Sequence, residues 1–373
     1  MNKRQIIFFI GTEAELIKIF PIMIECKKRE IPYKIVASGQ NDIVNSTIWD
    51  KFDCGEIDLI VSPVRHITTG FQLICWWFRA LLVAKRRIKR TFRDVDFRHS
   101  IMVVHGDTVS TVMGAFTGKH LGMRVAHVEA GLRSHHLFDP LPEEIDRLLT
   151  SRCARIHFAP GDTPLSNLKK AKGIVVNTVY NTLYDSLRWS MGVPLDSEKV
   201  HEIIEGSKYF VFVMHRQENL MKEEFVREVV NRIAMSARGD FKCVILLHAI
   251  TRNTFARLGI LELLRANPNI ILLPRTEYCD FMKLLKHAEF TITDGGSNQE
   301  ELYYMGHPCL IIRNRSEREE GLGKNATLLN GDLDLIPQFI SMYKEKANET
   351  VEVKEFPSRM IVDCLERELG EVK

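Results

Sequence analysis

The feature that most constrains this chain is a repeated alternation between short, continuously apolar runs and longer segments with helical periodicity. The runs are rich in Val, Ile and Phe, and polar or glycine residues follow each of them. The first six lie at residues 5–10, 33–37, 101–105, 125–129, 155–160 and 173–177. Strands that are apolar on both sides must be covered on both faces, so this alternation predicts a parallel sheet between two layers of helices.

The pattern stops at residues 189–199, which we interpret as a linker, and then starts again. Five further runs lie at residues 209–214, 243–248, 269–273, 290–293 and 308–313. A length of 373 residues also favours two domains. The sequence therefore predicts an α/β protein with two doubly wound, Rossmann-like domains, residues 1–185 and 200–350, and a C-terminal helix within 355–373.

Composition narrows the class of protein. With 45% hydrophobic and 27% charged residues and a net charge of +3, the chain is typical of a globular protein, and nothing in it points to nucleic acid as a partner. Its eight cysteines are scattered, which argues against a zinc site or a disulfide framework, and Cys309 is expected in a buried strand. The first apolar run is too short for a signal peptide and no run is long enough to span a membrane, so we expect a cytoplasmic protein.

The polar residues directly after the predicted strands are the candidates for catalysis, because open parallel sheets bind ligands at the carboxyl ends of their strands. Asp107, Glu129 and His215 occupy such positions, and Glu143 begins a predicted helix. Carboxylates and histidine are the groups that acid–base chemistry requires. Asp107 has an equally good interpretation as a helix cap, Glu143 as a favourable charge in a first helical turn, and His215 as a core histidine.

The stretch DGGSNQEE at residues 294–301 is the strongest local signal for a bound ligand. Glycines before a helix expose backbone N–H groups to a phosphate, although they are equally compatible with a simple tight turn. The acidic pair that follows suits ribose hydroxyls. A weaker phosphate candidate, Gly11, follows the first run. The candidate ligand contacts in this stretch are Gly295, Gly296, Ser297 and Glu301.

Six short motifs occur in one order along the chain. They are VHGDT (104–108), AHVEAGLR (126–133), PEEIDR (142–147), HFAP (157–160), HRQE (215–218) and the 294–301 stretch. Together they resemble the non-hydrolysing UDP-N-acetylglucosamine 2-epimerases, over residues 6 to about 320. The resemblance implies a GT-B architecture with the site in the cleft between the domains, a UDP-sugar ligand, a homodimer, and no metal or other cofactor.

The same resemblance implies the reaction. The family interconverts UDP-N-acetylglucosamine and UDP-N-acetylmannosamine, here for surface polysaccharide synthesis, by removing the C2 proton, expelling UDP and adding it back. Asp107, Glu129 and Glu143 would then be acid–base groups, His215 would lie at the pyrophosphate, and Glu301 would bind the ribose. The remaining substrate-binding candidates are basic residues that would balance charge, and they are Lys18, Arg133 and Arg216.

Three positions depart from the family pattern, and one segment is an addition to it. The serine of the glycine-rich stretch has moved to Ser297, and Tyr180 stands where the family has a glycine. Glu13 stands in the first phosphate loop where the family has an arginine. Residues 71–93 carry Trp76 and Trp77 and then a strongly basic run, which suits a surface helix packed on the sheet or on a dimer partner. The same residues also suit an interfacial helix on an anionic membrane, with the tryptophans at headgroup level. These features support a second hypothesis, a GT-B glycosyltransferase at the inner membrane face that uses a lipid-linked acceptor.

Overall fold

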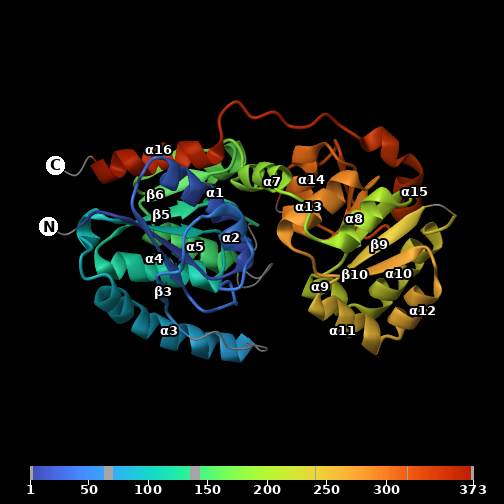
Figure 1. Ribbon diagram of the computed structural model, residues 1–373, viewed down its shortest axis with the longest axis horizontal. Helices are drawn as coiled ribbons and strands as arrows, with labels where there is room; N and C mark the ends of the chain where they lie inside the picture. The colour runs from blue at the N-terminus through green and yellow to red at the C-terminus, as the bar shows by residue number, and fades with distance from the viewer. Residues whose placement is uncertain (1–2, 63–69, 135–142, 240, 317, 371–373) are drawn as a thin grey trace. The chain divides into compact units, whose positions relative to one another are not determined.

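The computed structural model describes residues 3–62, 70–134, 143–239, 241–316 and 318–370 (Figure 1). The chain divides into two compact units. Unit 1 comprises Met1–Ser186 together with Lys354–Lys373, and unit 2 comprises Leu187–Val353. Each unit has its own sheet and its own core.

Unit 1 is built on a seven-stranded sheet with the order β3-β2-β1-β4-β5-β6-β7, in which every neighbouring pair is parallel. Its strands are β1 (Ile6–Ile10), β2 (Tyr33–Ala37), β3 (Leu59–Ile60), β4 (Ile101–His105), β5 (Arg124–Val128), β6 (Ile156–Ala159) and β7 (Ile174–Asn177). Its helices are α1 (Glu13–Lys28), α2 (Ile48–Phe52), α3 (Gly70–Thr91), α4 (Val109–Leu121), α5 (Glu143–Cys153), α6 (Asp162–Asn167), α7 (Leu183–Gly192), which ends in unit 2, and α16 (Pro357–Gly370).

The helices of unit 1 cover strands that are apolar on both sides. All five residues of β1 are buried, as are all five of β4. Gly114 lets α4 approach closely, because a Cβ there would lie 2.7 Å from a methyl carbon of Val104. The C-terminal helix α16 returns to unit 1 and packs along α1, as Figure 1 shows. Its first turn is fixed by Ser358, whose N and Oγ donate to the carboxylate of Asp185 at 3.1 and 2.9 Å.

Unit 2 is built on a six-stranded parallel sheet with the order β10-β9-β8-β11-β12-β13. Its strands are β8 (Tyr209–Val213), β9 (Lys242–Leu247), β10 (Ile270–Pro274), β11 (Thr291–Thr293), β12 (Cys309–Ile311) and β13 (Ala326–Leu328). Its helices are α8 (Glu198–Glu205), α9 (Gln217–Leu220), α10 (Glu223–Ser236), α11 (Ala249–Arg257), α12 (Ile260–Ala266), α13 (Tyr278–His287), α14 (Gly296–Met305) and α15 (Leu335–Met342). Phe210 and Phe290 stack in its core with ring centroids 4.8 Å apart.

The predicted doubly wound α/β fold is confirmed, and every predicted apolar run contains a strand. Cys309 lies fully buried in β12, as expected. Two strands were missed, β3 and β13, because two or three residues are too few to show a pattern. The predicted linker is wrong at both ends, since α7 continues to Gly192 and α8 begins at Glu198.

The predicted helix that contains Glu143 corresponds to α5, which the structure describes from Glu143 to Cys153. Across the described ranges, no helix is both long enough and apolar enough to cross a bilayer.

Candidate active site

Each sheet has one point where the chain reverses its direction of winding. In unit 1 the strands progress from β1 to β2 and β3, and the chain then crosses to β4 on the other side of β1. Unit 2 repeats this arrangement, with β11 on the other side of β8 from β9 and β10. Ligands of open α/β sheets bind beyond the carboxyl ends of the strands at such points. Asp107 and Glu129 follow β4 and β5 in unit 1, and His215 follows β8 in unit 2.

Glu129 is held in a buried network directly after β5. The Nζ atom of Lys18, on α1, lies 3.0 Å from both carboxylate oxygens, and the Nδ2 atom of Asn181 donates to Oε1 at 2.7 Å. His105 adds an Nε2 atom 3.3 Å from Oε2. Glu129 also has a φ of +62°, a conformation that costs energy for a side chain other than glycine and recurs at functional sites. Lys18, predicted to contact substrate, is therefore an ion-pair partner of Glu129.

Asp107 does not cap a helix, so that interpretation is wrong. The cap of α4 is Thr108, whose hydroxyl accepts hydrogen bonds from the backbone N–H groups of Ser110 and Thr111. Asp107 instead forms an ion pair of 2.5 Å with Arg147 on α5, which also lies 3.5 Å from Glu144. The carboxylate stays partly exposed. Arg147 thus holds Asp107 at the end of β4 without burying it.

The first turn of α5 contains three acidic residues, Glu143, Glu144 and Asp146. Glu144 is fully buried and pairs with Arg133, while the backbone N–H of Ser134 donates to it at 3.0 Å. Burial alone would raise the pKa of Glu144, but the hydrogen bonds from Ser134 and Arg133 lower it below its usual range. Arg133 and Glu144 therefore form a structural pair, and Glu143 is the acid of this turn that remains a catalytic candidate.

Asp146 is a third carboxyl of this region, and sequence analysis assigned it no role. Its side chain is buried, and burial, followed by the charges of Asp107 and Glu143, raises its pKa to about 8. A carboxyl with this pKa carries a proton at neutral pH. The PEEIDR motif contained this residue, but its burial beside two other acids depends on packing.

The loop between β1 and α1 is organised by another buried acid, Glu15. The backbone N–H groups of Gly11 and Thr12 donate to its Oε2 atom at 2.5 and 3.2 Å. Burial raises its pKa to about 7, against the lowering effect of hydrogen bonds from Thr108, Gly11, Thr12 and Thr111. Gly11 has a packing reason to be glycine, because a Cβ atom there would lie 2.0 Å from Oγ of Ser110.

In unit 2, Asp294 joins the ends of β8 and β11. This fully buried carboxylate accepts hydrogen bonds from the backbone N–H groups of His215 and Arg216 at 3.0 and 2.9 Å and from Nδ2 of Asn219 at 3.1 Å. Its Oδ1 atom lies 3.2 Å from Nδ1 of His215. Burial lowers the pKa of His215, although the charge of Asp294 opposes this effect. Asp294 therefore fixes the position of the His215 ring.

His248, which follows β9, is a neighbour that sequence analysis did not select. Its ring centroid lies 5.0 Å from that of His215, and burial, together with His215 and Arg275, lowers its pKa to about 4. His248 is therefore neutral at pH 7. The Nη1 atom of Arg216 lies 3.0 Å from Oε1 of Glu218, and the backbone N–H of Arg216 donates a hydrogen bond to Asp294.

The Gly-Gly-Ser sequence forms the start of α14. Gly295 is its N-cap and has no side chain to accept from the N–H groups of the first turn, which includes Gly296 and Ser297. A Cβ atom on Gly295 would lie 3.0 Å from Cε1 of His215, so only glycine brings this loop so close to the histidine. The positive end of a helix next to His215 favours an anion.

The two acidic residues of α14, Glu300 and Glu301, have different environments. Glu300 is fully buried, accepts from the hydroxyl of Tyr304 at 2.7 Å and pairs with Arg318, so it maintains the fold. Glu301 accepts from Nδ2 of Asn298 at 3.1 Å. Burial, followed by the charge of the nearby Glu301, raises the pKa of the Tyr278 phenol.

Comparisons with known proteins agree with this architecture. A sequence model of the family described as UDP-N-acetylglucosamine 2-epimerase matches residues 24–355. Proteins named UDP-N-acetylglucosamine 2-epimerase are 33% identical in Methanococcus maripaludis, over 331 residues and 86% of each chain, and 30% identical in Escherichia coli, over 364 residues and 92% of each chain.

Solved structures are similar over nearly the whole chain. The crystal structure of the UDP-GlcNAc 2-epimerase from Neisseria meningitidis bound to UDP-GlcNAc has a TM-score of 0.82 and 25% identity, covering 97% of this chain and 100% of that one. That of the Methanocaldococcus jannaschii enzyme in complex with UDP-GlcNAc and UDP has a TM-score of 0.80 and 25% identity, covering 97% and 99%. The resemblance inferred from the motifs is thereby confirmed, and these relatives do not favour the glycosyltransferase hypothesis.

Proposed function

The chain belongs to the UDP-N-acetylglucosamine 2-epimerase family, and from this membership we propose that it is an isomerase that interconverts UDP-N-acetylglucosamine and UDP-N-acetylmannosamine. The observation that carries the proposal is the set of carboxyls beyond β4 and β5 in unit 1. Asp107 is partly exposed beside Arg147 and Glu129 is buried beside Lys18. The pKa of Asp146 is raised by burial and then by the charges of Asp107 and Glu143. Carboxyls in such different environments suit a reaction that needs both a base and an acid.

The proposed reaction has two halves. A carboxylate removes the C2 proton of the sugar, the electron pair of that C–H bond forms the C1–C2 double bond, and the C1–O bond breaks so that UDP leaves. A carboxylic acid then returns a proton to the opposite face of C2 while UDP adds back to C1. We assign the proton transfers to Asp107, Glu129 and Glu143, because acid and base groups must lie within hydrogen-bonding reach of the reacting carbon.

We assign the UDP moiety to unit 2. The start of α14 offers backbone N–H groups to the pyrophosphate, and His215, fixed by Asp294, stands directly beside Gly295. These groups stabilise the charge that develops on UDP as it leaves. Glu301, at the same helix, is our candidate for the ribose hydroxyls. Arg216 contributes positive charge at the end of β8.

The roles of the other candidates follow from their contacts. Lys18 acts on substrate through the Glu129 carboxylate that it neutralises, and Arg133 acts by holding Glu144 and the first turn of α5. Gly11 shapes the loop between β1 and α1, which also contains Glu13. We further propose that the protein is a homodimer, which sedimentation analysis of the purified chain would test.

The decisive experiment is proton NMR of the purified protein with UDP-N-acetylglucosamine in deuterated water. We expect UDP-N-acetylmannosamine to appear and solvent deuterium to enter C2 of both sugar nucleotides. Release of free N-acetylmannosamine and UDP would instead indicate a hydrolysing enzyme. A folded protein that binds UDP and leaves the C2 proton untouched would refute the proposal.

The carboxyl roles are tested by Asp107→Asn and Glu129→Gln. Loss of an acid–base group lowers turnover by about 10²–10⁴-fold, whereas binding of UDP should hardly change. Glu56→Gln, which removes an exposed carboxyl of unit 1, is the matched control and should keep full activity. Variants that bind UDP far more weakly but turn over normally once saturated would show that these carboxyls hold the nucleotide.

A further inference from the structure

Helix α3 is held to unit 1 by one narrow stripe of its surface. Trp76, Ala80, Ala84 and Ile88 recur every four residues and are all buried in the core, where α3 packs on α4. Trp77 is fixed as well, since its Nε1 atom donates to the carbonyl of Val109 at 2.8 Å. The hypothesis that both tryptophans face lipid headgroups is therefore wrong for Trp76, which is only 6% exposed.

The opposite face of α3 is exposed and carries two kinds of residue. Near its middle, Phe78 and Leu82 lie one turn apart and are 58% and 80% exposed. Toward its end the exposed residues are cationic, and residues 70–93 contain no aspartate or glutamate. Within the part of the chain that the structure describes, no acidic side chain pairs with any of these exposed cations, which are Arg79, Lys85, Arg86, Lys89, Arg90 and Arg93.

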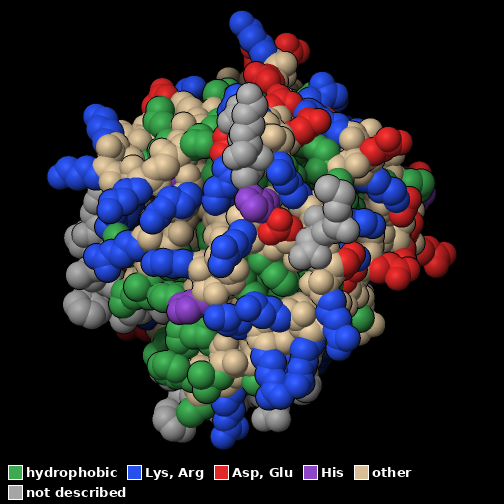
Figure 2. All heavy atoms as spheres, turned by 90° about the vertical axis from the view of Figure 1, so that its left-hand side faces the viewer, with side chains coloured by type: hydrophobic (Ala, Val, Ile, Leu, Met, Phe, Trp, Pro, Cys, Tyr) green, Lys and Arg blue, Asp and Glu red, His purple; other side chains and the backbone are tan. Residues whose placement is uncertain are grey.

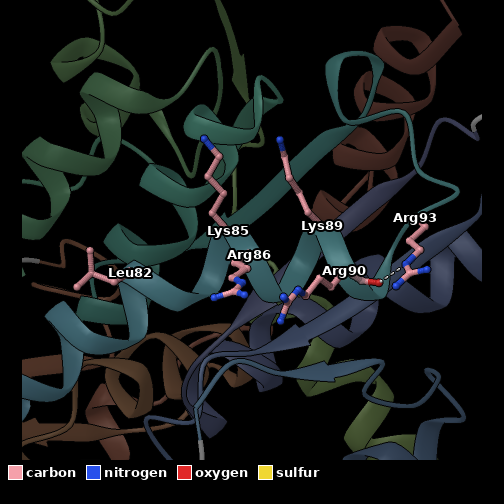
Figure 3. A pocket seen from close by; sticks show the side chains of 6 residues that line it. All are labelled: Leu82, Lys85, Arg86, Lys89, Arg90 and Arg93. Carbon is pink, nitrogen blue, oxygen red and sulfur yellow. Dashed lines mark hydrogen bonds between the residues drawn. The ribbon is translucent and has the colours of Figure 1, made fainter.

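A shallow groove runs along this face, lined by Leu82 and five of the cations (Figure 3). Lys85 and Lys89 point to one side of the helix, and Arg86 and Arg90 to the other. The charges therefore spread apart instead of converging on one small anion. In the lower part of Figure 2, over α3, Lys and Arg side chains lie beside hydrophobic ones and acidic side chains are scarce.

We propose that the exposed face of α3, from Phe78 to Arg93, binds the surface of an anionic lipid bilayer. Phe78 and Leu82 enter the boundary between headgroups and acyl chains, and the fan of Lys and Arg side chains contacts lipid phosphates. A bilayer presents many negative charges in one plane, which matches cations that diverge along a helix. This binding is independent of catalysis, because no residue of α3 belongs to the proposed active site.

A second copy of the chain is the main competing occupant. In a dimer with twofold symmetry the same patch meets itself, so a patch with six cations and no acid would face like charge. A nucleic acid would neutralise the cations but would leave Phe78 and Leu82 without an apolar partner. An anionic bilayer satisfies both kinds of residue.

The test is flotation of the full-length protein with lipid vesicles. We expect binding to phosphatidylcholine vesicles that contain phosphatidylglycerol, weak binding to phosphatidylcholine alone, and a marked loss in high salt. The variant K85E/K89E/R93E should lower the partition coefficient by on the order of 100-fold or more, from about fivefold for each lost cation. The variant F78S/L82S should lower it by about tenfold or more and remove the part that resists salt.

The matched control is K169E/K170E/K172E, which makes the same change in net charge at three exposed lysines between α6 and β7. It should bind vesicles like the unchanged protein. All variants should keep their helical circular dichroism and their activity in solution. The proposal is overturned if the unchanged protein fails to float with anionic vesicles, or if both triple variants lose binding equally. It is also overturned if the α3 variants change the oligomeric state while flotation stays the same, since the face would then join two copies of the chain.

Discussion

The ion pair between Lys18 and Glu129 leads to the sharpest stability prediction. Its two side chains are 7% and 5% exposed, and the Lys18 ammonium lies 3.0 Å from both carboxylate oxygens. Replacing Lys18 by Met keeps most of the volume of the side chain and removes the charge. Glu129 is then a buried carboxylate that retains hydrogen bonding from Asn181 and contact with His105 but has lost its ammonium.

The size of the effect follows from this burial. Removing one partner of a buried ion pair destabilises a protein by about 3–5 kcal/mol, because the remaining charge stays out of water. The two remaining neighbours of Glu129 place our expectation at the lower end, about 3 kcal/mol. For comparison, Lys199→Met breaks the exposed pair with Glu202, whose atoms are 3.2 Å apart, and should cost less than about 1 kcal/mol.

Urea unfolding followed by tryptophan fluorescence is the appropriate assay, since Trp49, Trp76 and Trp77 lie in unit 1 and only Trp189 lies in unit 2. Lys18→Met should lower the transition midpoint with an unchanged slope. Adding Glu129→Gln to it removes the stranded charge and should recover much of the loss, which gives a coupling of at least about 1 kcal/mol in a double-mutant cycle. If the two substitutions destabilise additively, the buried pair is not the cause and the reasoning fails.

Three further predictions concern other residues. Burial raises the folded-state pKa of Glu15 from 4.5 to about 7, so the unfolding free energy should fall by about 3 kcal/mol as pH rises between those values, and Glu15→Gln should remove that dependence in urea titrations at pH 5 and pH 8. Gly11→Ala should lower stability by about 1–3 kcal/mol because its Cβ would overlap Ser110, whereas Gly192→Ala, with open space around it, should be neutral or stabilising in thermal melts. His215→Ala should weaken UDP binding as well as turnover, and an unchanged dissociation constant in calorimetry would contradict its placement at the pyrophosphate.

The sequence was most informative where the apolar pattern of a single strand shows that both of its faces are covered. Residues 101–104 are all apolar, which is only stable between two layers, and the parallel sheet follows. The same reasoning placed Glu129 at the end of β5, because the run stops there. These are local properties of the chain, so they can be read without knowing which segments meet.

The partners of the site residues could not be predicted in the same way. Lys18 meets Glu129 across 111 positions of the sequence, and His215 meets Asp294 across 79. Both contacts depend on the order of strands in the sheets, which a pattern of apolar runs does not contain. Asp107 illustrates the same limit. A helix cap can be predicted from the residues next to it in the sequence, but the ion-pair partner of Asp107 is Arg147, which lies on α5, a helix distant in the sequence.

The points where the chain reverses its direction of winding in the two sheets also differ in charge. This difference explains how the chain can accommodate Glu13 in place of the family arginine. The end of the sheet in unit 1 gathers carboxyls, and burial raises the pKa of Glu15 and of Asp146 there. A pyrophosphate brought there would further oppose the ionisation of these carboxyls, because a nearby negative charge favours their protonated forms. Unit 2 instead offers the uncapped start of α14 beside His215, with Arg216 at the end of the neighbouring strand. Under the proposed division of roles, unit 2 binds the phosphates and unit 1 transfers the protons. An acidic residue at position 13, where the family has an arginine, therefore adds a carboxyl to the proton-transfer site. It leaves the anion site of unit 2 unchanged.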